Sequence, residues 1–215
     1  MSRVYVFALT SGRASPFTVQ GHRIQFIEVD HVFVAVERRA TAPALSEEEL
    51  RIQHTIVTAI FRRVEDLLPV RFGTWMDQRE LSEVVVARKA AILDALALVR
   101  GRVQMTLRFS SALPQSPEQK SGARRSESGT AYLEARRAAN RDVPRSLGEV
   151  RDAVRALVVA ERIGRGSEAL AGAVYHLISR VDVRRYRSLT RPFQSSVLTV
   201  SGPWPPFAFA PEPWA

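Results

Sequence analysis

The sequence predicts an α+β fold of two α/β subdomains, the second of them ferredoxin-like. Short β-branched runs alternate with amphipathic helical patterns along the chain, which indicates mixed secondary structure. Residues 1–100 carry 13 Lys and Arg against 12 Asp and Glu, whereas residues 101–215 carry 18 against 10. In the second half, strand and helix patterns alternate as in a ferredoxin-like sandwich with one strand missing or merged. We therefore expect an N-terminal domain over 1–100 and a C-terminal domain over 101–215 with an antiparallel sheet.

Three strands are predicted in the first 40 residues. Arg3–Leu9 is a continuous apolar run, typical of a strand that is buried on both faces. His22–Glu28 alternates between polar and apolar residues, and His31–Glu37 is rich in valine and phenylalanine. Because only Val29 and Asp30 separate these two runs, we expect a hairpin, although its turn lacks the usual glycine.

The strongest helix signal begins at Ser46, which is a good N-cap residue. Glu49 follows three positions later and completes a capping box, while Leu45 and Leu50 occupy the positions of a hydrophobic staple. Apolar residues then repeat at helical spacing, and we expect the helix to end at Pro69. The predicted apolar stripe consists of Val57, Ile60, Phe61, Val64 and Leu68.

A second helix and a strand are predicted to follow. After a strand-like connection over 70–75, Asp77 can cap a single helix that ends before Gly101. Arg102–Phe109 alternates between apolar and polar side chains. This alternation indicates an antiparallel strand with one face in water, on which Gln104 and Thr106 would lie.

The remaining segments complete the second subdomain. Residues 110–129 contain few apolar anchors and read as a flexible loop. The other expected elements are helices over 130–140 and 146–163, a strand over 169–180, a short basic helix over 182–193 and a last strand over 196–201.

The C-terminal end joins this last strand to a segment rich in proline and aromatic residues. Proline cannot donate to a sheet ladder, so the strand should end near Gly202. The segment that follows, Pro203–Phe209, should be stiff, extended and polyproline-like.

Composition excludes several classes of function. The chain has no cysteine, so it has no disulfide, thiolate nucleophile or cysteine-ligated metal. No apolar run reaches the ~18 residues of a membrane span, and the N-terminus does not resemble a secretion signal. The four histidines, His22, His31, His54 and His176, are not spaced as metal ligands. We expect no catalytic residue, cofactor or metal, a cytoplasmic location, and surface or packed roles for His54 and His176.

The net charge of +9 favours an anionic partner and leaves a second interpretation open. The arginines between Arg180 and Arg191 have Tyr186 among them, so they could hold phosphates while the tyrosine stacks on a base. A helix would spread these arginines around its surface, and the chain contains no familiar nucleic-acid module. Nucleic-acid binding is therefore the alternative function, and an enzyme of unrecognised type is the third.

Several segments together resemble one known family, the gas vesicle protein F / gas vesicle protein L family. The closing Ser-Gly-Pro-Trp-Pro-Pro-Phe-Ala-Phe is similar to that family's final motif, which usually has Tyr-Ser in place of Phe207-Ala208. A glutamate is common in the family where this chain has Gln104. The other matching segments are Leu68–Thr74, Gly129–Leu133 with Arg136-Arg137, and Ala173–Arg180.

The resemblance implies a non-enzymatic accessory protein of gas vesicle formation. Such a protein would bind the hydrophobic shell protein, gas vesicle protein A, and other accessory proteins, and would associate with gas vesicles in the cytoplasm. We expect no small-molecule substrate, and nucleic acid enters only as the partner in the alternative function given above. The candidate protein-interaction residues are Arg71, Trp204, Pro206, Phe207 and Phe209.

Overall fold

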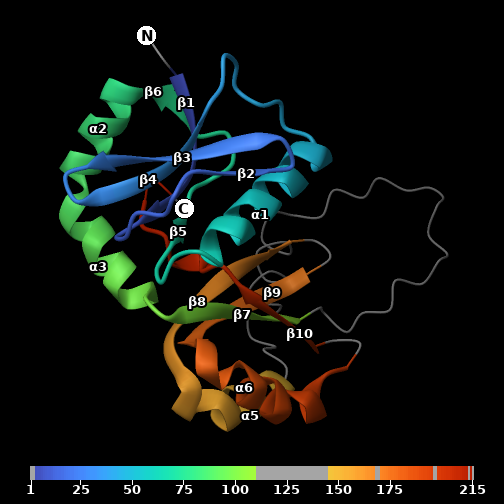
Figure 1. Cartoon of the computed structure of the whole chain (residues 1–215). Coiled ribbons are helices and arrows are strands. Elements are labelled where there is room, and N and C mark those ends of the chain that lie inside the picture. Colours follow the sequence, from blue (N-terminus) through green and yellow to red (C-terminus); the bar gives the residue numbers. More distant parts are fainter. Residues whose placement is uncertain (1–2, 110–144, 168–169, 196–197, 213, 215) are drawn as a thin grey trace, which may run out of the picture. The chain divides into compact units, whose positions relative to one another are not determined.

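The computed structural model describes residues 3–109, 145–167, 170–195, 198–212 and 214 (Figure 1). The loop expected over 110–129 and the helix expected over 130–140 lie outside these residues. Contacts divide the chain into two compact units. The first consists of Met1–Gln104, Leu177–Arg180 and Gly202–Ala215, and the second of Met105–His176 and Val181–Ser201.

This division is discontinuous in sequence, because the segment from Gly202 onwards belongs to the first unit. The charge step and the order of elements had led us to expect that segment in the second domain. The hydrogen bonds and ring contacts described below join it to other residues of the first unit. The contiguous two-domain division near residue 100 stays a prediction.

The first unit is built on a six-stranded sheet with the order β2-β3-β4-β1-β5, in which β6 also pairs with β1. Every residue of β1 from Val4 to Thr10 is buried, so both faces of this strand are covered, as its apolar run predicts. The strands are β1 (Arg3–Thr10), β2 (Phe17–Val19), β3 (His22–Val29), β4 (Val32–Arg38), β5 (Leu68–Pro69) and β6 (Trp75–Asp77).

The predicted hairpin between β3 and β4 is confirmed, with its turn one residue later than expected. Val29 pairs with Val32, which leaves Asp30 and His31 as the turn residues. Both have positive φ, 48° and 69°, as a type I′ turn requires. Aspartate tolerates this backbone better than most residues, which explains a turn without glycine.

Helix α1 (Glu47–Phe61) begins as the sequence predicts. The backbone N of Glu49 donates to the Ser46 side-chain oxygen at 3.2 Å, so Ser46 is the N-cap. The hydrophobic staple is wrong, because the Leu45 side chain is 79% exposed and cannot pack against Leu50.

The end of α1 also differs from the prediction, since the helix stops at Phe61 rather than at Pro69. Leu68 and Pro69 instead form β5, in which they pair with Leu9 and Ala8 of β1. Pairing with a buried central strand overrides the helical spacing of the sequence here. Pro69 is compatible with this role because β5 is an edge strand.

The single helix expected after Asp77 is in fact two helices, α2 (Gln78–Ala87) and α3 (Lys89–Val99). Asp77 caps α2 as predicted, since its side chain accepts from the backbone N of Glu80 at 2.8 Å. The chain leaves helical geometry at Arg88, where no proline or glycine marks the break. The strand-like connection expected over 70–75 lies between two short strands, β5 and β6, the second of which begins at Trp75.

The second sheet has four strands in the order β10-β7-β9-β8. Together with two helices these strands follow the βαββαβ order of a ferredoxin-like fold, which confirms the predicted fold class. The elements are β7 (Arg102–Phe109), α5 (Arg145–Val154), β8 (Val158–Ser167), β9 (Leu170–Ser179), α6 (Val183–Thr190) and β10 (Leu198–Trp204), with 3-10 turns η1 (Arg155–Leu157), η2 (Arg180–Asp182) and η3 (Arg191–Phe193).

The strand that the sequence left missing is β8. The helix predicted over 146–163 ends at Val154, and Val158 begins a strand that pairs with β9. Its β-branched residues suit a pleated surface, and pairing along β9 decides between helix and strand. The predicted strand over 169–180 and the basic helix over 182–193 correspond to β9 and to α6 with η3.

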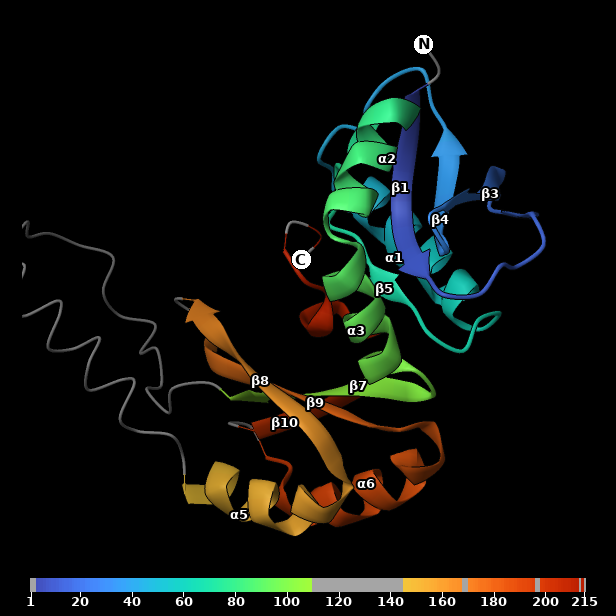
Figure 2. The ribbon, with the colours of Figure 1, turned by 90° about the vertical axis from the view of Figure 1, so that its left-hand side faces the viewer.

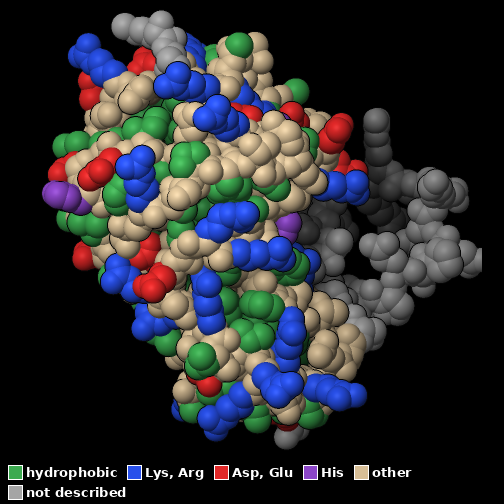
Figure 3. All heavy atoms as spheres, in the orientation of Figure 1, with side chains coloured by type: hydrophobic (Ala, Val, Ile, Leu, Met, Phe, Trp, Pro, Cys, Tyr) green, Lys and Arg blue, Asp and Glu red, His purple; other side chains and the backbone are tan. Residues whose placement is uncertain are grey.

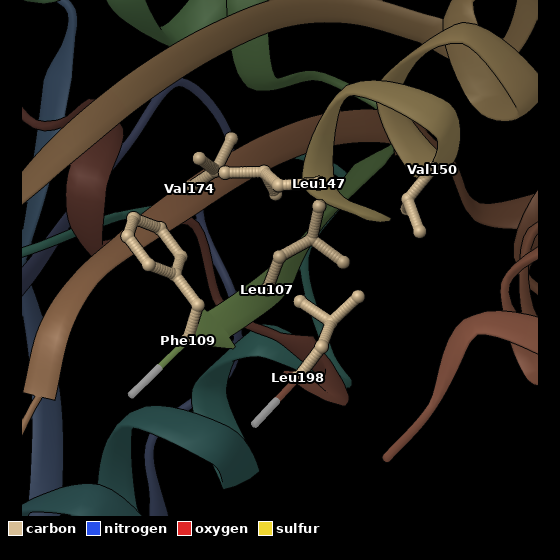
Figure 4. Packing of buried hydrophobic residues seen from close by; sticks show 6 residues of the cluster. All are labelled: Leu107, Phe109, Leu147, Val150, Val174 and Leu198. Carbon is tan, nitrogen blue, oxygen red and sulfur yellow. The ribbon is translucent and has the colours of Figure 1, made fainter. Parts of the chain in front are cut away.

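Helices α5 and α6 lie on the same face of this sheet in both views (Figures 1 and 2). Between them and the sheet is an apolar cluster to which β7, β9, β10 and α5 contribute (Figure 4). The cluster consists of Leu107, Phe109, Leu147, Val150, Val174 and Leu198.

Candidate protein-interaction site

The C-terminal segment from Gly202 to Trp214, called the tail below, continues directly from β10. The strand runs two residues beyond the predicted stop, through Pro203 to Trp204. The sequence predicts an extended segment here. This prediction is wrong for Phe207–Phe209, which form the 3-10 turn η4. In this turn the backbone N of Phe209 donates to the carbonyl of Pro206 at 3.0 Å.

Buried aromatics and backbone hydrogen bonds fix the tail to the first unit. Phe209 and Trp214 are only 1% and 2% exposed. The backbone N of Ala208 donates to Gln104 Oε1 at 2.8 Å, and the backbone N of Arg71 donates to the Trp214 carbonyl at 2.8 Å. The wet face predicted for β7 is therefore wrong: Gln104 is buried and accepts a hydrogen bond from the tail, and Thr106 is buried as well.

His54 of α1 is the ring against which the tail's partly exposed aromatics pack. Its imidazole meets the Trp204 ring edge-on at 5.6 Å between centroids, and it stacks on Phe207 at 6.1 Å. Such ring pairs contribute about 0.5–1.5 kcal/mol beyond the burial of their area. His54 is exposed, as the sequence suggested, and it links α1 to the tail.

A buried hydrogen-bond chain holds the backbone beside His54 in place. Gln53 accepts a hydrogen bond from the Tyr5 hydroxyl and donates through Nε2 to the carbonyl of Val70 at 3.0 Å. The Tyr5 hydroxyl in turn accepts from the backbone N of Gly73 at 3.0 Å. Burial raises the pKa of Tyr5, so this hydroxyl keeps the proton that it donates.

These elements enclose a groove of about 330 Å³, called the tail groove below. Its walls are largely apolar, and none of the described residues that line it carries a carboxylate. The Arg71 side chain is exposed at the groove. The lining residues are Leu50, Gln53, His54, Pro69, Val70, Arg71, Phe72, Phe207 and Trp214.

The structure separates the five candidate residues into two groups. Arg71 and Phe207 line the tail groove, and Trp204 contacts the same histidine as Phe207. Pro206 and Phe209 are buried, so they hold the tail and present little surface to a partner. That any of these residues contacts another protein stays a prediction.

Sequence reasoning missed several residues of the groove. Leu50, Gln53 and His54 are on α1, where the sequence predicts a staple role for Leu50, a surface position for His54 and no role for Gln53. Trp214 comes after the family-like motif. No sequence signal shows that α1 and the tail meet, because the contact joins residues about 150 positions apart.

Comparison with known proteins identifies the family of this chain. The sequence profile described as "Gas vesicle synthesis protein GvpL/GvpF" matches residues 3–211. The chain belongs to the GvpL/GvpF family. This membership supports a role related to gas vesicles.

Solved structures of the family share the fold. The chain is similar to the crystal structure of gas vesicle protein GvpF from Microcystis aeruginosa, with a TM-score of 0.75 and 12% identity over 98% of this chain and 100% of that chain. It is also similar to GvpF from Anabaena sp. PCC7120, with a TM-score of 0.70 and 15% identity over 98% and 99% of the two chains. No curated protein matches by sequence. Among the residues described, no helix is long and apolar enough to cross a membrane.

The second unit of this GvpL/GvpF-family chain contains an internal polar cluster around His176. His176 Nδ1 is 2.7 Å from the Tyr186 hydroxyl, and its Nε2 is 2.9 Å from Glu161 Oε2. Glu161 also accepts from Arg151 Nε at 3.0 Å. Burial lowers the pKa of His176 and raises that of Tyr186 far above its usual value. His176 is thus a packed histidine, as the sequence suggested.

The structure counts against the nucleic-acid alternative. Basic side chains gather over α5 and α6 on the face shown in Figure 3, and Arg184 and Arg185 are exposed on α6. Tyr186 between them and Arg187 is fully buried, however. The expectation that this tyrosine stacks on a base is therefore wrong.

Proposed function

We propose that this chain is an accessory protein of gas vesicle assembly that binds the hydrophobic shell protein, gas vesicle protein A. Family membership supports the gas-vesicle role. The observation that carries the finer proposal is the tail groove, where an apolar hollow lies beside partly exposed aromatic rings.

The physics of the shell subunit favours such a site. A subunit that polymerises into an apolar wall would aggregate before it is incorporated, so a partner must cover part of its apolar surface. The tail groove presents Leu50, which is 44% exposed, together with Phe72 and Phe207. These side chains can bury apolar atoms of the subunit, and each Å² of apolar area covered contributes roughly 25 cal/mol.

The groove is held by the fold before any ligand arrives. The Tyr5–Gln53–Val70 chain fixes one wall, and the bond from Ala208 to Gln104 fixes the tail. A preformed site loses less conformational entropy when it binds a ligand, and this favours binding of the shell subunit.

The proposal includes a non-enzymatic role without a cofactor. It also includes association with growing gas vesicles in the cytoplasm and contacts with other accessory proteins. Within the described part of the chain, no group of three or more His, Asp or Glu side chains is arranged to hold a metal ion.

The proposal is tested by co-purification of the tagged full chain with gas vesicle protein A at about 300 mM salt, where charge attraction alone is largely screened. A Trp204→Ala/Phe207→Ala variant should lose most of the shell protein, because both rings that contact His54 are removed. Val86→Ala, which truncates a 53% exposed side chain on α2, is the matched control and should keep it.

Circular dichroism must show that both variants are folded. Absence of shell protein from the wild-type sample would overturn the proposed function. Full retention by the folded double variant would show that the shell protein binds elsewhere on the chain.

A further inference from the structure

The tail groove combines apolar walls with one exposed arginine, and this combination limits the kinds of ligand that it can bind. We propose that it takes a segment of the shell protein in which an apolar side chain lies next to a carboxylate, with the carboxylate on Arg71. The identity of the partner rests on the proposed function above. The chemistry of the segment rests on the groove itself.

The volume and the lining of the groove indicate that the ligand contributes an apolar side chain. A hollow of about 330 Å³ is at the lower end of the range for ligand pockets, which start at roughly 300 Å³. Pro69, Val70 and Phe207 are among its apolar lining residues. It suits one or two aliphatic or aromatic side chains, and it is too small for a packed helix to enter whole.

Arg71 indicates that the ligand also contributes a carboxylate. Among the described residues the Arg71 guanidinium has no ion-pair partner, whereas Arg39 pairs with Glu37 and Glu49. The described lining of the groove contributes no carboxylate, so the Arg71 charge is left for a ligand. Arginine matches a carboxylate through two parallel N–H donors, and such charge-assisted bonds are the strong ones.

Trp214 adds an independent observation at the same groove. Its indole Nε1 is buried and has no hydrogen-bond partner within the described parts of the chain. An indole N–H can only donate, and a buried donor without an acceptor destabilises the structure that contains it. A ligand oxygen would supply the missing acceptor if the Trp214 ring turned toward the groove on binding.

The charge of the whole chain favours an acidic partner over a second copy. At a net charge of +9, two copies repel each other, while an acidic segment is attracted from a distance. Nucleic acid fits the groove poorly, because a single arginine among apolar walls does not follow a phosphate backbone.

The test uses fluorescein-labelled synthetic peptides that tile the sequence of gas vesicle protein A, titrated with the full chain and followed by anisotropy. Each peptide that contains Asp or Glu is paired with one that carries Asn or Gln instead. The wild-type chain should prefer at least one acidic peptide that also contains apolar residues by about tenfold, which corresponds to ~1.4 kcal/mol, because the apolar walls would remove water from part of the charge pair.

Arg71→Gln should bind that acidic peptide about tenfold more weakly and should lose the preference over its amide twin. This double-mutant comparison isolates the pairing from other effects. Arg71→Glu should bind the peptide more weakly still, and it should regain affinity when the acidic residue of the peptide is changed to arginine. Arg62→Gln removes an exposed arginine of the same unit that does not line the groove, and it should bind as the wild type does.

Folding does not obscure this experiment. The Arg71 side chain is exposed, and the bond to the Trp214 carbonyl is made by its backbone N, which every substitution except proline retains. Surface changes of this kind usually leave the stability of the fold almost unchanged.

The outcomes separate the two claims. Equal binding of acidic and amide peptides, or an Arg71→Gln variant with wild-type affinity, would overturn the acidic-segment assignment while shell-protein binding stands. A wild-type chain that binds neither the peptides nor the intact shell protein would overturn both. Arg71-dependent binding of a DNA duplex, or a dimer that Arg71→Glu disrupts, would assign the groove to another occupant and overturn the inference.

Discussion

The two phenylalanines of the tail should respond very differently to truncation. Phe209 is 1% exposed and anchors the tail in the first unit, while Phe207 is only partly buried and lines the tail groove. The prediction is that Phe209→Ala loosens the fold, whereas Phe207→Ala mainly weakens binding of the shell protein.

The magnitudes follow from burial. Removing a fully buried phenylalanine costs about 3–5 kcal/mol, because the transfer free energy is lost and a cavity remains. Phe207 loses its stacking on His54 and part of its buried area, which amounts to roughly 1–2 kcal/mol. For a chain of this length each kcal/mol lowers Tm by about 2–4 °C, so Phe209→Ala should lower it by roughly 6–20 °C.

Urea unfolding followed by circular dichroism, with co-purification of the shell protein on the same samples, measures both effects. Coincident transitions by tryptophan fluorescence and circular dichroism are needed before the free energies are compared. A loss below about 1 kcal/mol for Phe209→Ala would refute the anchor role. Equal losses for the two variants would refute the distinction between anchor and contact.

Other predictions concern the second unit. Gly172→Ala should destabilise by about 1–3 kcal/mol in urea unfolding, because an added Cβ would lie 2.5 Å from the Phe109 ring. Gly148→Ala, in open space on α5, should instead stabilise by up to about 1 kcal/mol, and a loss there would contradict the helix. Burial lowers the pKa of His176 below 6.5 in the folded chain. As the pH falls, the unfolded chain therefore binds a proton at this residue before the folded chain does. The stability that His176 contributes is then present above about pH 6.5 and is lost as the pH falls below it, and His176→Gln should flatten this part of the curve of unfolding free energy against pH. An unchanged slope would show that the buried ring does not govern acid sensitivity.

Local signals in the sequence predicted most starts of elements and few of their ends. Ser46 and Asp77 cap their helices through side-chain bonds made within four residues, so the sequence contains all that these bonds need. The ends depend on partners elsewhere in the chain. Leu68 leaves the helical pattern because it pairs with Leu9, and Val158 does so because β8 pairs with β9.

The same contrast holds for the candidate site. Proline and aromatic residues drew attention to the tail, and two of the predicted residues, Arg71 and Phe207, line the groove. The roles of Pro206 and Phe209 were not separable from the sequence, because burial depends on what packs against them. His54 carried no sequence signal, since a histidine on an exposed helix face has many equivalents.

By itself the sequence determined the α+β class, the capped helix starts, the central apolar strand and the family resemblance, because each depends on spacing or composition along one stretch of chain. Only the tertiary structure decided where strands replace predicted helices, that Gln104 is buried and bonded to the tail, and that the tail contacts α1 to form a groove. These outcomes depend on contacts between residues far apart in the sequence, and their free energy exists only once the chain has folded.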